Sequence, residues 1–328
     1  MAVIGMAQGQ SVGRGHARRG RVLRRSRYNE HPLLPYLFIL PHTLFFGTFV
    51  LFSAGLGVYI SLHKFDYLRS HHYFVGGRNY QHLLFVPGNL YHDNFFTALH
   101  NTVTYALMSV PALVILSLLV ANLLNARFRG RTIFRGLYLI PSVISVTVIG
   151  FIFGTLYFGS PDQGLVNLSL RALRQQQIPF LASTTWIWPV ITLAKLWSGV
   201  GWTAIILLAG LQTISIALYE AAQVDGAGPV ARFIHVTLPG IKPVLLFVLI
   251  TTMLGAFNEY GLPTVMLGQG GGPGGGPDNV GLTVIMRIAE AGWSLNAMGM
   301  AAAMSFVFGG ILAALSIIGF RYLRTDRG

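Results

Sequence analysis

Long apolar runs separated by short polar stretches occupy most of the chain from residue 33 onward. A helix that crosses a lipid bilayer needs about 20 predominantly apolar residues, within a range of about 17 to 25. Six runs reach this length, so the pattern predicts six membrane-spanning helices. The first lies within residues 33–62 and spans from about Leu40 onward. The others cover about residues 98–124, 133–158, 186–213, 244–262 and 297–322.

The composition supports a membrane protein. Of the 328 residues, 53% are hydrophobic and 10% are charged, whereas soluble domains carry about 25% charged residues. The chain therefore has too few polar side chains to cover a soluble surface. The absence of cysteine excludes disulfides, thiolate metal sites and thiol nucleophiles.

Basic residues are unevenly distributed along the chain. Lysines and arginines number 23 against 10 acidic residues, which gives a net charge of +13. In a soluble protein this charge would favour nucleic-acid binding, but in a membrane protein positively charged loops face the cytoplasm. Most basic residues fall in the N-terminal tail, between the second and third spans, in residues 219–240 and at the C-terminus. Both termini are therefore predicted to be cytoplasmic, and no nucleic-acid partner is expected.

This topology divides the chain into four parts. Residues 1–32 form a basic cytoplasmic tail that is expected to be disordered, and residues 33–97 hold the first span and an external segment. Residues 98–323 form a core domain of five spans with a cytoplasmic loop at 219–240, and residues 324–328 are the cytoplasmic C-terminus. The tail is not expected to be a cleavable signal, because the apolar run behind it exceeds the roughly 7–15 residues of signal peptides.

The loop between the fourth and fifth spans reads YEAAQVDGAGPVARFIHVTLPG over residues 219–240. Good helix formers predict a short helix over residues 219–225, with Glu220 in the first turn, where the helix dipole favours an anion. Gly226 and Gly228 allow a sharp or left-handed turn after this helix. Pro229 suits the first position of a second helix.

The second helix of this loop is predicted to end at the sequence LPGIKP. Pro239 and Pro243 disfavour helical backbone in the residues that precede them. A simple connection between two spans needs only a few residues, whereas this one uses about thirty and gives them a fixed shape. The loop is therefore interpreted as a docking element.

This loop resembles the EAA loop of bacterial binding-protein-dependent ABC importer permeases. The motif consists of Glu-Ala-Ala, a gap of two residues, Asp-Gly-Ala, and a later hydrophobic-x-Leu-Pro. The matching residues here are Glu220, Ala221, Ala222, Asp225, Gly226, Ala227, Val236, Leu238 and Pro239. Val236 replaces the usual isoleucine.

Further matches resemble the carbohydrate-uptake branch of that family, which includes maltose and glycerol-3-phosphate permeases. They are FVGGRNYQHLL at residues 74–84, ALHNTVTYAL at 98–107, FNEYGLPTVMLGQGGGPG at 257–274 and AMGMAAAMS at 297–305. The resemblance covers residues 37–323. It departs in the external loop, where Gly268, Gln269 and an extra run of glycines replace the usual Thr-x-Gly-Gly-Pro-Gly.

The resemblance implies an all-α integral membrane protein with the type I ABC importer transmembrane fold, in the bacterial inner membrane. The chain would be a permease subunit that imports a sugar or related polyol. Its expected partners are a second homologous permease chain, two ABC ATPase subunits, an external substrate-binding protein, the carbohydrate and the lipid bilayer. The helix over residues 219–225 would be the coupling helix that docks on an ATPase, and Gly226 would make the turn behind it.

The chain itself is not expected to be an enzyme or to hold a cofactor, since the resemblance places ATP and magnesium on the partner ATPases. The glycine-rich stretch GQGGGPGGGP at residues 268–277 lacks the Gly-Lys-Ser/Thr of a phosphate-binding loop. It is expected to be a mobile external loop.

Charged residues inside spans are costly and mark candidate functional sites. Glu259 lies near the outer end of the fifth span and Lys195 lies within the fourth. A path for a hydroxyl-rich ligand also needs polar groups and aromatic faces. The predicted substrate path consists of Asn101, Lys195, Trp197, Trp202, Asn258, Glu259 and Tyr260. Alternatively, Glu259 lies at the interface, Lys195 extends toward the headgroups, and the other residues belong to packing or the aromatic belt.

Two other classes of protein are compatible with the apolar pattern. A self-sufficient secondary transporter would need intramembrane acidic relays or matching broken helices in two halves. A membrane-embedded enzyme would need histidines and carboxylates converging at one depth. One glutamate and one lysine within spans, with scattered histidines, favour neither class. The small residues Gly299, Ala301, Ala302 and Ala303 in the sixth span predict close helix packing.

Overall fold

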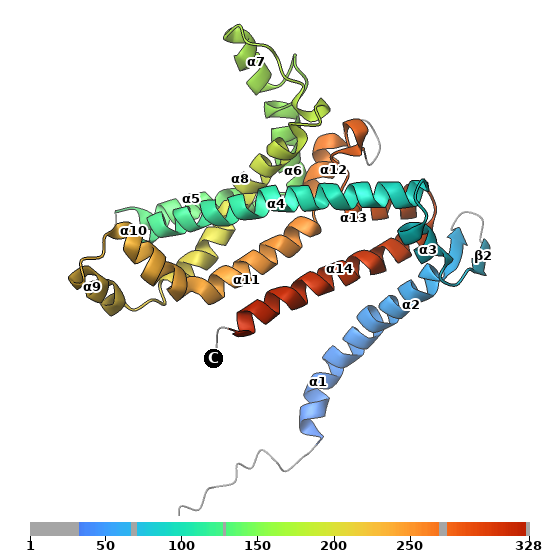
Figure 1. Cartoon of the computed structure of the whole chain (residues 1–328), viewed down its shortest axis with the longest axis horizontal. Helices are drawn as coiled ribbons and strands as arrows, with labels where there is room; N and C mark the ends of the chain where they lie inside the picture. Colours follow the sequence, from blue (N-terminus) through green and yellow to red (C-terminus); the bar gives the residue numbers. More distant parts are fainter. Residues whose placement is uncertain (1–32, 67–70, 127–128, 269–273, 326–328) are drawn as a thin grey trace, which may run out of the picture. The chain divides into compact units, whose positions relative to one another are not determined.

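The computed structural model describes residues 33–66, 71–126, 129–268 and 274–325 (Figure 1). It divides into two units, Met1–Ala54 and Gly55–Gly328, which are described separately. The basic tail predicted over residues 1–32 lies outside the described residues. So does much of the glycine-rich stretch, from residue 269 to residue 273.

The first unit contains one helix, which continues into the second unit. It consists of α1 (Leu34–Phe45), a π-helical turn (Phe46–Leu51) and α2 (Phe52–Ser61). The helix lies within the predicted run of residues 33–62 but begins before Leu40. Pro35 permits the early start, because a proline in the first helical turn removes an amide donor that has no partner there.

A two-stranded hairpin follows this helix. Strands β1 (His63–Asp66) and β2 (His71–Phe74) are antiparallel, and α3 (Arg78–Phe85) comes after them. Opposite aromatic side chains support the pairing, since the His63 and Phe74 rings lie 5.3 Å apart. Apart from this short hairpin, the regular structure in the described residues is helical, which confirms the all-α fold class.

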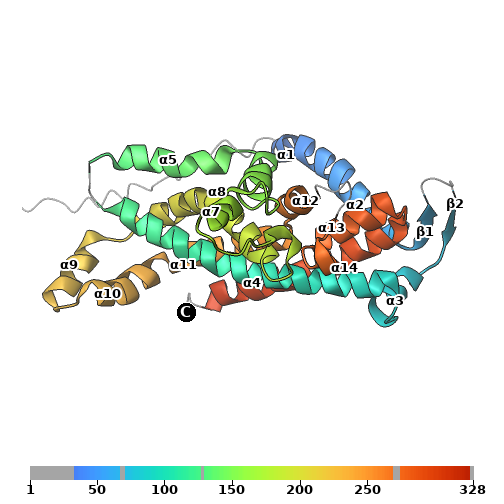
Figure 2. The ribbon, with the colours of Figure 1, turned by 90° about the horizontal axis from the view of Figure 1, so that it is seen from above.

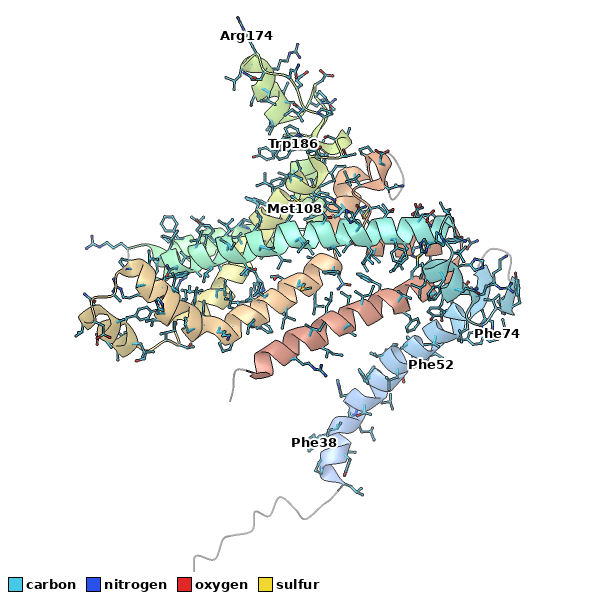
Figure 3. All side chains as sticks on the ribbon, viewed as in Figure 1. Phe38, Phe52, Phe74, Met108, Arg174 and Trp186 are labelled. Carbon is cyan, nitrogen blue, oxygen red and sulfur yellow. The ribbon has the colours of Figure 1, made fainter. Side chains whose placement is uncertain are left out.

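Two long helices form the centre of the second unit, α4 (Leu90–Asn125) and α8 (Ile187–Leu211). Buried residues recur every three or four positions along α4, so one face of this helix packs against its neighbours. The Tyr105 ring lies 5.2 Å from the Trp188 ring across the interface with α8. The opposite face of α4 is apolar and exposed, as at Leu107 and at Met108 (Figure 3).

The third predicted span is broken. It consists of α5 (Arg131–Val143), then α6 (Val146–Phe151) and a π-helix (Ile152–Tyr157), with a bend of 87° between the two parts. Ser145 causes the restart of the helix, because its side chain accepts a hydrogen bond from the Val148 amide as an N-cap. The described residues therefore hold five helices long and apolar enough to span a membrane, or six if this bent pair counts as one span.

The predicted helix stop before the fifth span is also wrong. A single helix runs through α10 (Pro229–Arg232), a π-helix (Phe233–Thr237) and α11 (Leu238–Phe257). Pro239 is the second residue of α11, just after the π-helix. The hydrogen-bond register changes at this point, so the amide hydrogen that proline lacks costs little stability. The helix ends five residues before the predicted Leu262, and α12 (Gly261–Leu267) starts after a short break.

Shorter elements complete the second unit. They are α7 (Leu165–Ala172), α9 (Ile216–Val224), α13 (Val284–Ala289), a π-helix (Glu290–Ser294), and 3-10 turns at Phe180–Ala182 and Pro277–Asn279. The last helix, α14 (Met298–Thr325), agrees closely with the sixth predicted span. Gly299 does allow a close approach, but to strand β1 and not to a helix, because a Cβ atom there would overlap the carbonyl oxygen of His63.

The elements of the second unit are arranged along α4 (Figures 1 and 2). Helices α9 and α10 lie beyond one end of α4, and the hairpin and α3 lie at the other end. The C-terminal ends of α4 and α14 point toward the end that holds α9 and α10. The connections predicted to be cytoplasmic within this unit therefore gather at one end.

Candidate functional site

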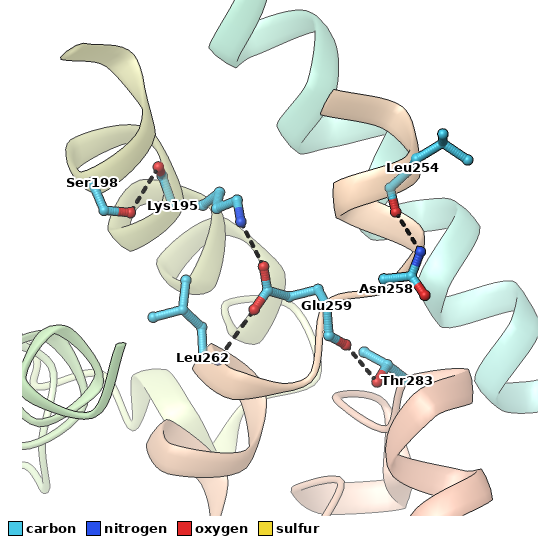
Figure 4. Close-up of polar contacts among 7 residues, drawn as sticks. All are labelled: Lys195, Ser198, Leu254, Asn258, Glu259, Leu262 and Thr283. Carbon is cyan, nitrogen blue, oxygen red and sulfur yellow. Dashed lines mark hydrogen bonds and ion pairs between the residues drawn. The ribbon is translucent and has the colours of Figure 1, made fainter. Parts of the chain in front are cut away.

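The two charged residues singled out within the spans form an ion pair. Lys195 Nζ on α8 lies 2.7 Å from Glu259 Oε2, in the break between α11 and α12 (Figure 4). The Glu259 side chain is only 8% exposed, whereas that of Lys195 is 29% exposed. A buried charge needs a partner because leaving it unpaired in a low dielectric is costly. The ion pair explains how both charges are accommodated within the spans.

The break between α11 and α12 holds Glu259 in place. Its second carboxylate oxygen, Oε1, accepts a hydrogen bond of 3.3 Å from the Leu262 amide, near the N-terminus of α12. Its backbone carbonyl accepts a hydrogen bond of 2.9 Å from the Thr283 hydroxyl (Figure 4). The helix N-terminus is a favourable place for a carboxylate.

A cavity of about 410 Å³ opens beside this ion pair. Its polar lining consists of Lys195, Glu259, Ser142 and Ser198, and Trp202 contributes an aromatic face. The hydroxyl protons of both serines are donated to backbone carbonyls, which leaves oxygen lone pairs as acceptors. The cavity therefore offers an ammonium group, a carboxylate, hydroxyl oxygens and an indole ring, a set that suits a ligand with several hydroxyl groups.

The remaining predicted path residues lie outside this cavity. Trp197 lines a separate apolar cavity of about 610 Å³ and its ring contacts Phe153 at 5.6 Å. Asn258 is exposed and donates its amide to the Leu254 carbonyl at 2.9 Å. Tyr260 is 41% exposed at the start of α12. Of the seven predicted residues, the structure thus brings together Lys195, Trp202 and Glu259.

Asn101 has a different position from the one its sequence context suggested. Its side chain is 5% exposed, and its amide nitrogen donates to the carbonyls of Asn279 at 2.8 Å and Leu282 at 3.2 Å. These bonds fasten α4 to the connection before α13. The residue is therefore positioned to hold that connection rather than to line the cavity.

Sequence reasoning missed the part of the cavity wall that comes from the broken third span. Ser142, Val143, Ile144 and Val146 line the cavity on both sides of the break. The signal available in the sequence was the pair of serines in PSVISVTV, one of which is a good N-cap in the middle of an apolar run.

The short helix predicted over residues 219–225 is present as α9, but it begins three residues earlier than expected. Because α9 starts at Ile216, Glu220 does not lie in the first turn, and the predicted dipole interaction of its carboxylate is wrong. Asp225 caps the C-terminus, and Gly226 follows with φ +78°, which confirms the turn expected there. The amide of Ala227 closes the turn on the Ala222 carbonyl at 2.9 Å.

Helix α9 is exposed along its whole length and none of its residues is buried. Ile216, Leu218 and Val224 are 63%, 55% and 88% exposed. Glu220 and Ala221 are exposed as well, and Ala222 is half-buried.

A side-chain hydrogen bond links α9 to the helix behind it. The Tyr219 hydroxyl lies 3.0 Å from the hydroxyl of the buried Thr237. The predicted residues Leu238 and Pro239 begin α11 directly after Thr237. This hydrogen bond connects α9 to the residue that precedes α11.

Among the described residues, no group of three histidines, aspartates or glutamates is close enough to hold a metal ion.

Comparison with known proteins identifies the family. A family model described as the binding-protein-dependent transport system inner membrane component matches residues 85–324. The chain belongs to this family. The match covers most of the chain, including the ion pair and α9, so both lie within the shared domain.

Named relatives and a solved structure agree with this assignment. YurN of Bacillus subtilis (strain 168), named a probable ABC transporter permease protein, is 30% identical over 91% of this chain and 99% of its own length. The arabinooligosaccharides transport system permease protein AraP of Halalkalibacterium halodurans is 32% identical over 88% of this chain and 87% of its own.

The structural comparison concerns the fold alone. A crystal structure of a bacterial alginate ABC transporter, in complex with an alginate pentasaccharide-bound periplasmic protein, contains a chain with a TM-score of 0.73. Its sequence identity is 21%, and the match covers 89% of this chain and 94% of that one. This family member therefore has the fold of a transport permease.

Proposed function

We propose that this chain is the permease subunit of an ATP-driven importer and that α9 is its coupling helix, docked on a separate ATPase subunit. The exposed α9 is the observation that carries the proposal. Ile216, Leu218 and Val224 expose apolar side chains on a short helix, and such a surface is typical of an interaction site. The small Ala221 and Ala222 would allow close approach of a partner surface.

The substrate is proposed to be a sugar or related polyol. The relative AraP carries arabinooligosaccharides in its name, and the cavity beside Lys195 and Glu259 combines hydroxyl acceptors with an aromatic face. In this proposal Lys195, Trp202 and Glu259 lie on the substrate path. Tyr260, Asn258 and Trp197 would join them only if the cavity extends into a partner chain.

The assembly is proposed to contain a second homologous permease chain, two ATPases and an external substrate-binding protein. The matched alginate transporter was crystallised with a periplasmic protein, which supports the last of these partners. We further propose six spans, with the broken third span counted as one, and both termini in the cytoplasm. ATP and magnesium would bind to the ATPases, and this chain would carry out no covalent chemistry.

A continuous helix between α9 and the Lys195–Glu259 ion pair supports this function. The π-helix contacted by α9 continues without interruption into α11, so residues 229–257 form one helix of about 43 Å. That helix ends two residues before Glu259. Movement of the ATPases would therefore displace α9, shift α11 along its length and change the geometry of the break that holds the ion pair.

The decisive experiment compares two glycines in the same loop. A side chain at Gly226 is strained because φ is +78°, whereas Gly228 has φ −70° and ψ 172°, and neither position has an atom within 4 Å of a built Cβ. We expect Gly226→Leu to lose the co-purifying ATPase and at least about tenfold of ATP-driven uptake, corresponding to about 1–2 kcal/mol of backbone strain. Gly228→Leu serves as the control and is expected to keep both.

The measurement is mass spectrometry of the complex solubilised from its own membrane, together with uptake in vesicles. Equal ATPase retention and equal uptake in both variants would refute the assignment of α9 as the coupling helix. Solute uptake by the isolated chain without ATP would instead support the secondary-transporter alternative.

A further inference from the structure

A second polar cavity is lined by residues of the hairpin and α3. These elements lie together at one end of the second unit (Figure 2). The volume of the cavity is about 400 Å³, and its walls come from β1, β2, α3 and the starts of α4 and α14. None of its lining residues is shared with the cavity beside the Lys195–Glu259 ion pair. The two cavities are therefore separate features.

The lining of this second cavity is basic. Lys64 comes from β1, and Arg78 and His82 lie four residues apart on one face of α3. Lys64 Nζ lies 5.7 Å from the ring centroid of Tyr73, its partner across the hairpin. The described lining residues include no carboxylate. No ion pair joins Lys64 or Arg78 to an acidic side chain within the described part of the chain.

Specific contacts fix the walls of the basic cavity. The side-chain amide of Asn79 donates to the carbonyls of Ser61 at 2.8 Å and His63 at 3.1 Å, which fastens α3 to the start of the hairpin. The Tyr80 hydroxyl donates to the Ser61 hydroxyl at 2.8 Å. Gly299 lets α14 approach the His63 carbonyl more closely than any side chain would allow. Specific contacts therefore hold the elements that carry Lys64 and Arg78 against each other.

The position of the cavity along the helices places it at the depth of lipid headgroups. Lys64 lies three residues beyond Ser61, where one membrane-spanning helix ends, and Gly299 is the second residue of another. The aromatic residues Phe74 (Figure 3) and Phe85 flank this region and are 69% and 76% exposed. Exposed aromatic and basic side chains at the ends of spans are typical of the membrane interface.

We propose that this basic cavity binds the headgroup of an anionic phospholipid. Arg78 and Lys64 take the phosphodiester, because a guanidinium fork and an ammonium group match phosphate oxygens, and Tyr73 is placed to bond a headgroup hydroxyl. A carboxylate from a protein partner would leave most of the 400 Å³ empty. The site would accept a lipid from either leaflet, so it does not depend on the orientation of the chain or on the proposed import function.

The test is native mass spectrometry of the full chain, with its co-purifying subunits, in detergent titrated with short-chain phosphatidylglycerol. Phosphatidylcholine of the same chain length and inorganic phosphate are titrated in parallel. We expect phosphatidylglycerol to bind at least tenfold more tightly than either. Lys64→Gln with Arg78→Gln is expected to weaken that binding roughly thirtyfold, as the loss of two basic residues near a headgroup implies.

The matched control is Arg171→Gln with Arg174→Gln, which removes the same charge from exposed positions on and after α7, outside the cavity. This control is expected to bind phosphatidylglycerol like the unmodified chain. If the double variant at the cavity fails to fold, Lys64→Gln alone decides the question, since Lys64 is exposed on the hairpin, and it is expected to weaken binding about fivefold.

Three results would overturn the proposal. Equal loss in the cavity variant and the control would mean that the lipid responds only to overall charge. Binding of inorganic phosphate as tight as that of phosphatidylglycerol would identify a site for free anions. Unchanged lipid binding in the cavity variant, combined with loss of an external protein partner, would identify a protein contact.

Discussion

At the scale of single residues, the pair formed by Lys195 and Glu259 is the most consequential feature of this chain. Two charges that are separated by 64 residues in the sequence meet at 2.7 Å in the structure. Glu259 is the more buried partner and would be left without compensation if Lys195 were removed. Leaving one buried charge alone costs more than removing both, because the desolvation cost of the remaining ion persists.

The first prediction follows from the deeper burial of Glu259 compared with Lys195. Lys195→Met is expected to destabilise the protein by up to about 3 kcal/mol, a discounted value because Lys195 is 29% exposed. Lys195→Met combined with Glu259→Gln is expected to recover most of that loss, since Gln retains the Oε1 acceptor for the Leu262 amide. Thermal unfolding of the purified complex in one detergent measures both changes.

Asn258→Ala is the control for this cycle, because Asn258 is exposed and bonds only to the Leu254 carbonyl. It is expected to shift the unfolding midpoint little. A double variant as unstable as Lys195→Met would show that the ion pair is not the source of the effect.

Unchanged apparent affinity for transported solute in Glu259→Gln would place this carboxylate outside the substrate path.

At the scale of elements, glycines decide how closely helices can pack. Gly201 on α8 faces the backbone of α5, and a Cβ there would overlap the carbonyl oxygen of Tyr138. Gly150 and Gly154 play the same role between the broken third span and α12, where a Cβ would press on Val265 and Met266. These contacts hold the helix break that forms one wall of the cavity.

The second prediction concerns Gly201→Ala, which is expected to destabilise the protein by about 1–3 kcal/mol, because α5 must move away from α8. The same change at Gly255 on α11, where no atom lies within 4 Å of a built Cβ, is the matched control. It is expected to be neutral or to stabilise by up to about 1 kcal/mol through helix propensity. Unfolding midpoints of the two variants compare these effects, and equal midpoints would contradict the packing role of Gly201.

At the scale of the whole molecule, the connections of the second unit that are predicted to be cytoplasmic lie at one end (Figures 1 and 2). The α4–α5 connection, α9 and the C-terminal end of α14 share that end. This arrangement satisfies the grouping that positively charged loops require.

The third prediction addresses the orientation of the chain in the membrane. Because the chain has no cysteine, single substitutions introduce unique labels. Leu173→Cys, after α7, is expected to react with a membrane-impermeant maleimide in right-side-out vesicles. Arg129→Cys, between α4 and α5, is exposed and is expected to react only after permeabilisation. The reverse pattern would invert the proposed topology.

Periodicity and composition were sufficient to predict a helical membrane protein and the places of most of its spans. Apolar runs of bilayer length, such as the one that became α8, have few stable alternatives, because lipid offers no hydrogen-bond partners to an open backbone. The turn at Gly226 was predictable for a local reason, since only glycine adopts φ +78° without strain. The helix end expected near Pro239 was predicted wrongly, and the break at Ser145 was not predicted. The reason is that neighbouring turns decide whether a proline or a serine interrupts a helix.

The sequence by itself determined the class of protein, the coupling-loop motif and the two charges within the spans. Only the tertiary structure decided that those charges pair with each other, that Asn101 fastens a connection, and that Arg78 and His82 join Lys64 around one cavity. The reason is physical. Hydrophobic patterning acts over a few neighbouring residues, whereas the partner of a buried charge is chosen by how distant helices pack.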